Sequence, residues 1–561
     1  MDFDTLFVHP PALYDFRRRI LFPGPIAHTV ADSTHQFIVF PVGLLSMAEY
    51  LDRNGYKTAI DNLGERMVTD ETFDAESHLR NSDARVYAID LHWCTHSQGA
   101  VEVARLCKQL HPNSFVLLGG LTATCFHEEI IRNFPFIDAV IRGEAEEPLL
   151  QLLSKLDARS SLSEVSNLTY RDGNRILANE LAQPRSSLDD LDFTRLDLVK
   201  PRKAPVFERA SVPVCRGCVY DCVSCGGSAY SYRRLFGRDR PAFRSPEKIL
   251  EDLTRLDEQG VDVVFLFQDP CMGGRKYWKE LLAVLKSDKS NIGTLSLELF
   301  VPPPAEFLEN LSTIGERVTL TISPESGVDS VMKAHGRPYT DKELLSTAAL
   351  CMRLGLRLTV FFMVGLAGET HNTFEQTSSL WEEFYAMNDS RSQRLRAGGA
   401  VRHAFGSMIL LDPGSLAFDY PEKYGYRLLF KNLRDYIEGM LKPSWHQWIS
   451  YETRKLGRDD IAMLTLYALA ESARVREKYG VYTVPEEAVE EYFISRAGQI
   501  VLEEVDRAMQ FADAQETLNR LENLSQMLTS YPRSAPTDPY AYRAAIQRAT
   551  LESVGLLDAA C

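Results

Sequence analysis

The chain has 561 residues, a formal net charge of −15, and hydrophobic and charged contents of 45% and 25%. This length exceeds one ordinary core and predicts about three domains, and the composition is typical of a globular protein. The chain contains no run of about eighteen apolar residues, so no membrane span is predicted. An acidic balance without a basic tract argues against a nucleic-acid surface. We therefore expect a cytoplasmic protein with no membrane or nucleic-acid partner.

Residues 1–156 alternate short β-like runs with helical runs, which is typical of a doubly wound α/β domain with a parallel sheet. Ligands of such sheets bind beyond the carboxyl ends of the strands. No G-x-G-x-x-G follows the first strand, so a dinucleotide site is not favoured. The expected strands are 5–9, 57–61, 85–90, 114–118 and 138–142, and the clearest amphipathic helices are 43–54 and 98–110.

Small and polar residues follow the later strands of this predicted sheet. Glycine at a strand end lets a large ligand approach the backbone, although ordinary turns would explain the same glycines. The residues concerned are His92, Trp93, Gly119, Gly120, Thr122, Gly143 and Glu144.

Residues 157–205 show little periodicity and are interpreted as a linker with a few strands. A second series of strands and helices occupies 206–420 and predicts a partial (βα)6 TIM-type barrel, with function at the carboxyl ends of its strands. Ser245 is the expected N-cap of a helix over 246–259. The expected strands are 210–214, 261–267, 294–301, 317–322, 356–364 and 401–410.

The loop after the first barrel strand is rich in cysteine. Cys218, Cys222 and Cys225, which we call the cysteine triad, have the spacing Cys-x3-Cys-x2-Cys, and Cys215 precedes them. Three thiolates can hold three irons of a [4Fe–4S] cluster and leave the fourth iron open for chemistry. A structural zinc site is an alternative, but it normally needs two separated cysteine pairs. Four ordinary cysteines are the other alternative.

Residues 421–561 are expected to be mostly helical, with amphipathic runs at 461–479, 486–512 and 514–530. Such a segment could cap the barrel mouth and exclude water. An aromatic stripe, Trp445 to Tyr451, could stack on a flat substrate, or it could be interdomain core.

The cysteine triad resembles the motif of the radical S-adenosylmethionine (SAM) superfamily, in which the open iron binds the methionine end of SAM. One departure is Ser224, because the residue before the last cysteine is often aromatic there. The resemblance implies SAM contacts at other strand ends, with Asp269 taking a catalytic place near the ammonium group of SAM. The implied contacts are Gly226, Gly227, Gln268, Asp269, Ser323, Glu325 and Gly365.

Placed before that motif, the first domain resembles the cobalamin-binding domain found upstream of many radical SAM enzymes. The resemblance implies that the glycine loops hold cobalamin. The Asp-x-His-x-x-Gly signature that supplies a cobalt ligand is missing after the first strand, so we interpret His92 and Trp93 as pocket lining. Arg66, after the second strand, could reach the lower face of the cobalt and affect its catalytic step, or it could be a surface arginine.

Together the parts resemble the cobalamin-dependent radical SAM methyltransferases, over residues 1–420. This implies transfer of a methyl group from SAM, through methylcobalamin, to a carbon of a small molecule, with an electron donor such as flavodoxin or ferredoxin. An indole or pyrrole of a natural-product pathway is the expected substrate. The alternatives are a ring-forming or rearranging enzyme that uses the same cofactors, and a non-catalytic cobalamin-binding protein.

Overall fold

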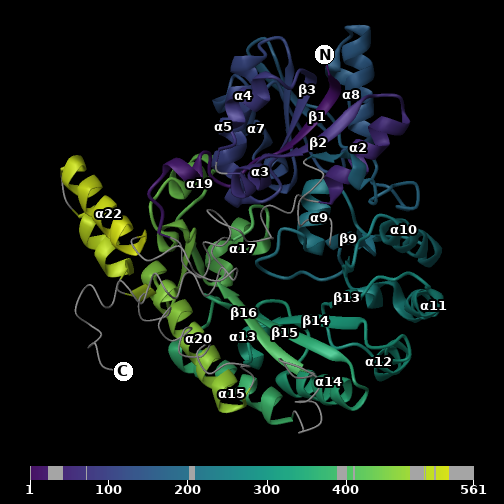
Figure 1. Ribbon diagram of the computed structural model, residues 1–561, viewed down its shortest axis with the longest axis vertical. Coiled ribbons are helices and arrows are strands. Elements are labelled where there is room, and N and C mark those ends of the chain that lie inside the picture. Colours follow the sequence, from purple (N-terminus) through teal and green to yellow (C-terminus); the bar gives the residue numbers. More distant parts are fainter. Residues whose placement is uncertain are drawn as a thin grey trace.

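The computed structural model describes residues 2–22, 42–70, 72–200, 209–387, 401–407, 411–480, 498–499, 501–510 and 513–529. An amino-terminal α/β domain is stacked on a second parallel sheet, and the carboxy-terminal helices run along one side (Figure 1). Within the described ranges, no helix is long and apolar enough to cross a membrane.

The first sheet has eight strands in the order β7-β6-β5-β4-β3-β1-β2-β8. Strands β5, β4, β3, β1, β2 and β8 are parallel, and β6 and β7 add an antiparallel hairpin beside β5. The strands are β1 (Phe3–His9), β2 (Thr58–Asn62), β3 (Ala84–Asp90), β4 (Phe115–Gly119), β5 (Ala139–Ile141), β6 (Leu168–Asp172), β7 (Arg175–Ala178) and β8 (Val199–Lys200).

Both faces of this sheet are covered by helices, as its alternating side chains require. In β1, Phe7 joins the core that includes residues of α2 and α8, whereas Leu6 and Val8 join the core that includes α5 and α7. The doubly wound architecture expected from the sequence is confirmed. The helices are α2 (Gly43–Arg53), α3 (Leu63–Thr69), α4 (Ala75–Arg80), α5 (Ser97–Leu110), α6 (Leu121–Cys125), α7 (His127–Asn133) and α8 (Glu146–Ala158), with short 3-10 turns η1 (Phe16–Arg18), η3 (Cys94–His96), η4 (Leu162–Glu164) and η5 (Leu196–Leu198).

The segment interpreted as a linker, 157–205, differs from that expectation because it supplies three strands of the first sheet, β6, β7 and β8. The hairpin turns at Gly173, whose φ is +58°, and its buried residues are confined to Leu168, Thr169 and Tyr170. The few strands expected in this segment are therefore part of the first domain rather than of a separate linker.

The second sheet has six strands in the order β16-β15-β14-β13-β12-β9, and every pair is parallel. Strand order that follows chain order, with helices between, is that of a partial barrel, as expected. Ser245 caps α10 by accepting a hydrogen bond from the Lys248 amide, which confirms that expectation. The strands are β9 (Arg209–Pro213), β12 (Val263–Phe267), β13 (Thr294–Leu299), β14 (Val318–Glu325), β15 (Arg357–Val364) and β16 (Val401–Ser407).

Alternate residues of the barrel strands face outward into the main core. In β13, Leu295, Leu297 and Leu299 belong to this core together with residues of the covering helices, whereas Ser296 and Glu298 are half-buried. The elements between the strands are β10 (Cys215–Arg216), β11 (Ala242–Phe243), η7 (Pro270–Gly273), α9 (Ala229–Phe236), α10 (Pro246–Glu258), α11 (Gly274–Ser287), α12 (Ala305–Ser312), α13 (Asp329–Ala334), α14 (Asp341–Arg353) and α15 (His371–Met387).

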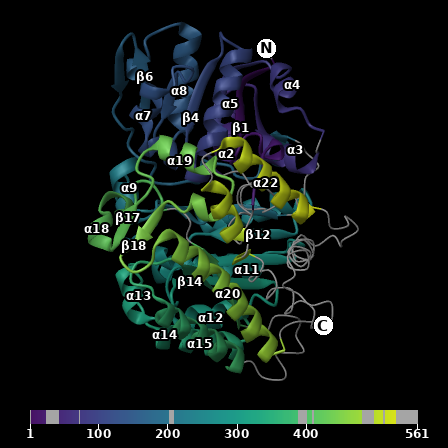
Figure 2. The ribbon, with the colours of Figure 1, turned by 90° about the vertical axis from the view of Figure 1, so that its left-hand side faces the viewer.

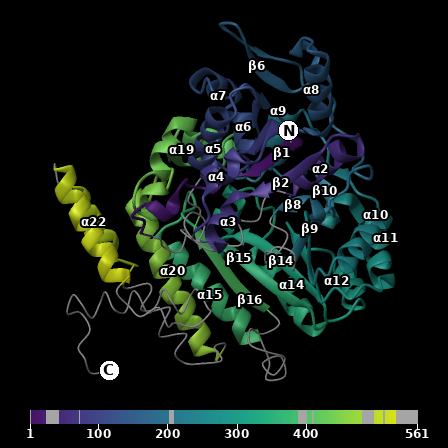
Figure 3. The ribbon, with the colours of Figure 1, turned by 45° about the horizontal axis from the view of Figure 1, so that its top comes forward.

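The carboxy-terminal segment connects the two sheets. Helix α19 packs on α5 of the first domain, and α20 packs on α15 of the barrel, so this segment touches both (Figure 2). Helix α22 lies at the periphery (Figure 3), and part of the helical run expected at 486–512 lies outside the described residues. The elements are α17 (Leu416–Asp419), α18 (Pro421–Tyr424), β17 (Tyr426–Leu428), α19 (Leu433–Met440), η8 (Trp445–Trp448), β18 (Tyr451–Thr453), α20 (Arg458–Lys478) and α22 (Ala514–Thr529).

Candidate functional site

The cysteine triad lies on the loop that follows β9, at the carboxyl end of the barrel strands. Its thiols are close enough to raise one another's pKa. Backbone amides already point at two of them: Tyr220 N–H lies 3.4 Å from Cys218 Sγ, and Gly227 N–H lies 3.3 Å from Cys225 Sγ. Amide donors of this kind stabilise a thiolate. The loop therefore presents three thiols on one short segment, which is the donor set that an iron–sulfur cluster needs.

Backbone packing explains why the loop adopts this shape. Gly217 has a φ of +112°, and a Cβ there would lie 2.9 Å from Pro241 Cα. Gly336 has a φ of +82°, and its Cβ would lie 2.7 Å from the Asp221 carbonyl. The Val223 amide donates to the His335 carbonyl at 3.2 Å. The loop is thus held against the segment that follows β14.

Cys225, His92 and Asp412 combine access to solvent with a burial-shifted pKa. The Cys225 side chain is exposed, yet burial by the surrounding protein raises the pKa of its thiol well above the usual value. His92 and Asp412 have the same combination of partial exposure and a burial-shifted pKa, lowered for the histidine and raised for the carboxyl.

Asp269, for which the sequence predicts a place near the ammonium group of SAM, directly follows β12. It is fully buried, and its two carboxylate oxygens accept the amides of Cys271, at 2.7 Å, and Phe300, at 2.9 Å. The neighbouring Gln268 has a φ of +75°, and its buried Oε1 has no hydrogen-bond partner among the described residues. Asp269 is therefore committed to the backbone, and Gln268 is available to a ligand.

Glu325 ends β14 at a φ of +71° and forms a buried ion pair with Arg337. Arg337 also acts on the cysteine triad, since its charge lowers the pKa of Cys218 and Cys222 against the effect of burial. Within the described residues, Glu325 Oε2 and Arg337 Nε have no hydrogen-bond partner, and Ser323 is half-buried on the same strand. Arg337 had no assigned role in the sequence, because its partner lies twelve residues away across a turn.

Gly365 lies at the carboxyl end of β15 in a turn that only glycine suits. Its φ is +96°, and a Cβ would lie 2.5 Å from the hydroxyl of Tyr451, which donates to the Gly365 carbonyl at 2.9 Å. The buried Glu369 carboxylate accepts the amides of Gly365, at 2.7 Å, and Leu366, at 3.3 Å, and burial raises its pKa to about 7. Glu369 thus closes the turn.

The loops after β3 and β4 lie together, as expected. Gly120 has a φ of +109°, and a Cβ there would lie 2.6 Å from the His92 amide. The Thr122 hydroxyl donates to the His92 carbonyl at 2.9 Å, and the Trp93 ring lies edge-on to His92 at 5.1 Å. At Gly119, by contrast, a Cβ would meet nothing closer than a carbonyl at 3.8 Å. These loops therefore leave open backbone at Gly119 for a ligand to approach.

The loop after β5, which contains Gly143 and Glu144, contacts the barrel. Glu144 forms an ion pair with Arg238 of the barrel, and Glu146 binds Arg216 at 2.6 Å. Gly143, at a φ of +67°, lies against Phe236. These residues join the two domains, since Arg216 directly follows Cys215 on the way to the cysteine triad.

Arg66 lies on α3 with its guanidinium on Asp61, at 2.7 Å, and 5.7 Å from the Phe73 ring centre. Asp61 also binds His78 at 2.5 Å. The preceding residue, Glu65, is buried, its Oε1 has no partner among the described residues, and burial raises its pKa to about 7. A cobalt-facing role for Arg66 remains a prediction.

The two domains meet at Gly226. A Cβ at this position would lie 2.6 Å from Leu121 Cδ2 of the first domain and 2.9 Å from Asp412 Cβ, which follows β16. A Cβ at the neighbouring Gly227 would lie 3.6 Å from Cys225 Sγ. The cysteine loop, the loop after β4 and the loop after β16 therefore touch one another at the seam between the domains.

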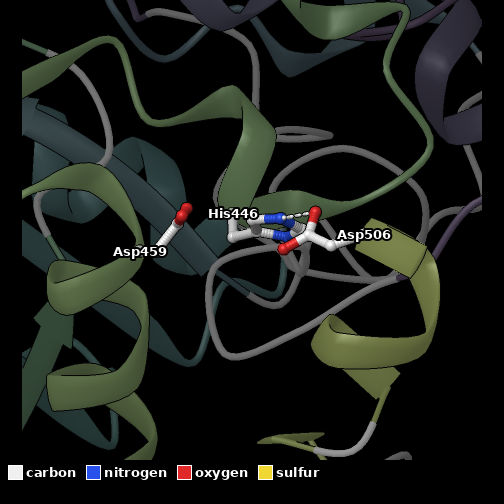
Figure 4. A group of neighbouring side chains, drawn as sticks. All are labelled: His446, Asp459 and Asp506. Carbon is white, nitrogen blue, oxygen red and sulfur yellow. Dashed lines mark hydrogen bonds and ion pairs between the residues drawn. The ribbon is translucent and has the colours of Figure 1, made fainter. Parts of the chain in front are cut away.

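The aromatic stripe of the cap is interdomain core. Trp445, Trp448 and Tyr451 are fully buried in one apolar cluster with Leu366 and other residues. Beside it, His446, Asp459 and Asp506 approach one another (Figure 4). His446 binds Asp506 at 2.9 Å, and Asp459 is an exposed acid in the first turn of α20, so an ordinary ion pair and a helix-end charge account for this group.

Family models match two parts of the chain: the B12 binding domain model matches residues 29–153, and the Radical SAM superfamily model matches residues 212–380. The first match includes β2 to β5 of the first sheet, and the second includes β12 to β15 of the barrel. The family models imply a [4Fe–4S] cluster and SAM for the barrel and cobalamin for the first domain.

Curated relatives are distant. The chain is 24% identical over 375 residues to the anaerobic magnesium-protoporphyrin IX monomethyl ester cyclase of Cereibacter sphaeroides, covering 64% of this chain and 59% of the relative. It is 25% identical over 345 residues to an uncharacterized methyltransferase of Pyrococcus horikoshii, covering 60% and 72%. It is 21% identical over 444 residues to the cytidylyl-2-hydroxyethylphosphonate methyltransferase of Streptomyces wedmorensis, covering 70% and 81%. The chain thus spans less than two thirds of the cyclase.

Two solved structures share the whole arrangement. The radical SAM methyltransferase TsrM of Kitasatospora setae, with tryptophan and a SAM analogue bound, has a TM-score of 0.58 at 14% identity, covering 88% of this chain and 95% of that one. The cobalamin-dependent SAM radical enzyme OxsB has a TM-score of 0.57 at 12% identity, covering 98% and 79%. Likeness at this identity shows the fold. The chain therefore has a region that matches the Radical SAM superfamily model, preceded by a region that matches the B12 binding domain model, in a fold shared with these two structures.

Proposed function

We propose that this chain is a cobalamin-dependent radical SAM methyltransferase that moves a methyl group from SAM to a carbon atom of a small molecule. One observation carries the proposal: the loop of the cysteine triad touches the carboxyl-end loop of the first sheet, with Gly226 packed between Leu121 and Asp412. A methyltransferase of this kind needs its cofactors to meet between the two domains.

The cysteine triad would hold the cluster, and the fit is supported by three thiols on one loop and by the amides that point at Cys218 and Cys225. Open backbone at Gly119, beside His92 and Trp93, would accept the corrin. When bound, the cluster would supply the electron that cleaves SAM, and cobalamin would supply the carrier for the methyl group.

Glu325 and Arg337 would bind the methionine end of SAM. The pair is buried, and each member keeps one polar atom without a protein partner, an oxygen on Glu325 and a nitrogen on Arg337. A zwitterion that carries an ammonium and a carboxylate complements both atoms. Gln268 Oε1 offers a further acceptor. In this site Asp269 acts indirectly, by fixing the backbone beside Gln268.

The substrate class follows from comparison rather than from the cap. Because Trp445 and Trp448 are core residues, they give no support for stacking on an indole or pyrrole. The similarity to TsrM, which was solved with tryptophan, supports an aromatic heterocycle as substrate. Reduction of the cluster would need an electron donor such as flavodoxin or ferredoxin, and an oxygen-labile cluster suits the reducing cytoplasm.

The test is to incubate the anaerobically reconstituted protein with a chemical reductant and with SAM whose methyl group is trideuterated. Tryptophan, indole or pyrrole-2-carboxylate is added as the substrate. Formation of S-adenosylhomocysteine with transfer of the label is expected. If neither S-adenosylhomocysteine nor 5′-deoxyadenosine forms, the chain is a binding protein and the proposal fails.

A ring-forming reaction is the second candidate, favoured by the likeness to the protoporphyrin ester cyclase. It would yield 5′-deoxyadenosine and a product without the label, so the same experiment separates the two functions.

A further inference from the structure

A cavity of about 410 Å³ lies in the carboxy-terminal segment, away from the residues assigned to the cofactors. Its walls come from α19, the η8 turn, the first residue of α20 and the end of the helical residues 501–509. Sites for small molecules begin at about 300 Å³, so this cavity has room for one. Among the described residues, its lining includes none from the cysteine loop or from the loops at the strand ends.

Gln447 presents a buried polar atom to this cavity. It is 9% exposed, and its Oε1 has no hydrogen-bond partner within the described ranges. Its neighbours in the η8 turn are satisfied: His446 binds Asp506 at 2.9 Å (Figure 4) and Ser444 at 2.9 Å. Trp448 Nε1 donates to a backbone carbonyl at 2.9 Å. A buried amide oxygen without a donor is destabilising, and a ligand that donates to it would remove that cost.

Arg458 presents the complementary group. It begins α20 and lines the same cavity, and its buried Nε has no hydrogen-bond partner in the part of the chain that the structure describes. Asp459 lies 3.5 Å from this nitrogen but does not accept its hydrogen. Lys442, which is exposed, adds a second cation to the wall. A guanidinium N–H pairs best with a charged oxygen, such as that of a carboxylate.

Much of the remaining wall is apolar. Leu429, Phe430 and Met509 line the cavity, and Met509 is 37% exposed although it is large and apolar. The flexible thioether of methionine adapts to ligands of different shape. Glu438, on α19, supplies a negative charge. A ligand that matches this wall therefore carries a cationic donor, an anionic acceptor and an apolar group.

We propose that this cavity binds a free α-amino acid with an apolar side chain. The ammonium group of the ligand donates to Gln447 Oε1, and its carboxylate accepts from Arg458 Nε. A neutral apolar molecule would leave both of these atoms without partners, and a simple anion would leave the Gln447 oxygen without a donor. The inference goes beyond the proposed function and does not rest on it, because the lining contains none of the residues assigned to the cofactors.

The test is isothermal titration calorimetry of the full-length holoenzyme with L-leucine. Saturating S-adenosylhomocysteine is present throughout, so that leucine does not occupy the proposed SAM site. Two analogues each lack one charged group: 3-methylbutylamine has no carboxylate, and 4-methylpentanoate has no ammonium group. We expect leucine to bind about tenfold more tightly than either analogue, as for the loss of a hydrogen bond to a charged group.

Two variants assign the binding to this cavity. Gln447→Met keeps the length of the side chain and removes the oxygen, so it should weaken leucine binding about tenfold. It should leave the affinity for 4-methylpentanoate unchanged, because that analogue has no ammonium group. Arg458→Met should weaken leucine binding similarly and leave the affinity for 3-methylbutylamine unchanged. Arg454→Met is the matched control, because Arg454 is an exposed arginine of the same segment that does not line the cavity.

Absence of leucine binding up to about 10 mM would overturn the inference, as would equal affinities for leucine and the two analogues. Unchanged leucine affinity in either folded variant, or a loss in Arg454→Met equal to that in Arg458→Met, would also overturn it. A variant that loses every probe is unfolded, and the other variant then decides. No methyl transfer is measured, so failure of the proposed function is scored separately, by the labelled-SAM experiment.

Discussion

The ion pair between Glu146 and Arg216 should be a main energetic link between the two domains. Glu146 is 2% exposed and would normally resist ionisation, yet Arg216, at 2.6 Å, and the Ser46 hydroxyl, at 2.9 Å, lower its pKa from 4.5 to about 2. Since each tenfold change in proton affinity is worth about 1.4 kcal/mol, the charged form is favoured by roughly 3 kcal/mol. Glu146→Gln should lower the free energy of unfolding by up to about that amount, because it removes one of the two carboxylates, Glu146 and Glu144, that pair with the Arg216 guanidinium.

Urea unfolding followed by tryptophan fluorescence measures this, with Trp93 reporting on the first domain. Glu147→Gln is the control: Glu147 is the exposed neighbour, its carboxylate accepts a hydrogen bond from the Tyr50 hydroxyl, and its loss should cost under about 0.5 kcal/mol. The pKa of Glu146 is lowered in the folded state, so its stabilisation is complete above pH 4.5 and is lost as the pH falls towards about 2. A Glu146→Gln variant as stable as the Glu147→Gln control would refute the reasoning.

Three further predictions concern the cofactors. Replacing the cysteine triad by alanine should abolish the visible absorbance of the cluster. Cys215→Ala should keep this absorbance, because Cys215 is buried with its thiol 3.8 Å from the Gly217 carbonyl. Retention of about four irons per chain in the triple variant would contradict the assignment. Arg337→Met should weaken SAM binding about tenfold or more, because it leaves Glu325 as an unpaired buried charge. Equilibrium dialysis measures this, and an unchanged dissociation constant would show that the pair does not bind SAM. Arg66→Met should shift the Co(II)/Co(I) midpoint potential if the guanidinium faces the cobalt, and an unchanged potential would show that Arg66 serves only Asp61.

Much of the fold follows from local sequence patterns. All five expected strands of the first domain and all six of the barrel are present, because long alternations of apolar residues are dictated by burial on a sheet. Ser245 could be recognised because its cap lies three residues from its partner. The sequence did not show that the hairpin of β6 and β7 belongs to the first sheet. Its pairing with β5 is a tertiary contact, and no local pattern in the sequence predicts it.

The candidate site was less accessible from sequence. The cysteine triad is local, so its spacing was legible. Arg337, Glu369 and Asp412 had no signal of their own, because their importance comes from partners brought together by the turns after β14, β15 and β16. Asp269 shows the converse: an acid at a strand end suggested ligand chemistry, yet the backbone amides of neighbouring segments occupy both of its oxygens.

The contact at Gly226 has a consequence for how such enzymes could diverge. A methyl group at this position would press on both Leu121 and Asp412. It would therefore increase the spacing between the proposed cobalamin site and the proposed cluster site. Substitution here would change the distance between the two cofactor sites that the substrate must span, without changing any residue that binds the substrate. Natural variation at this one position could change which substrates fit, while the residues that bind the metals stay the same.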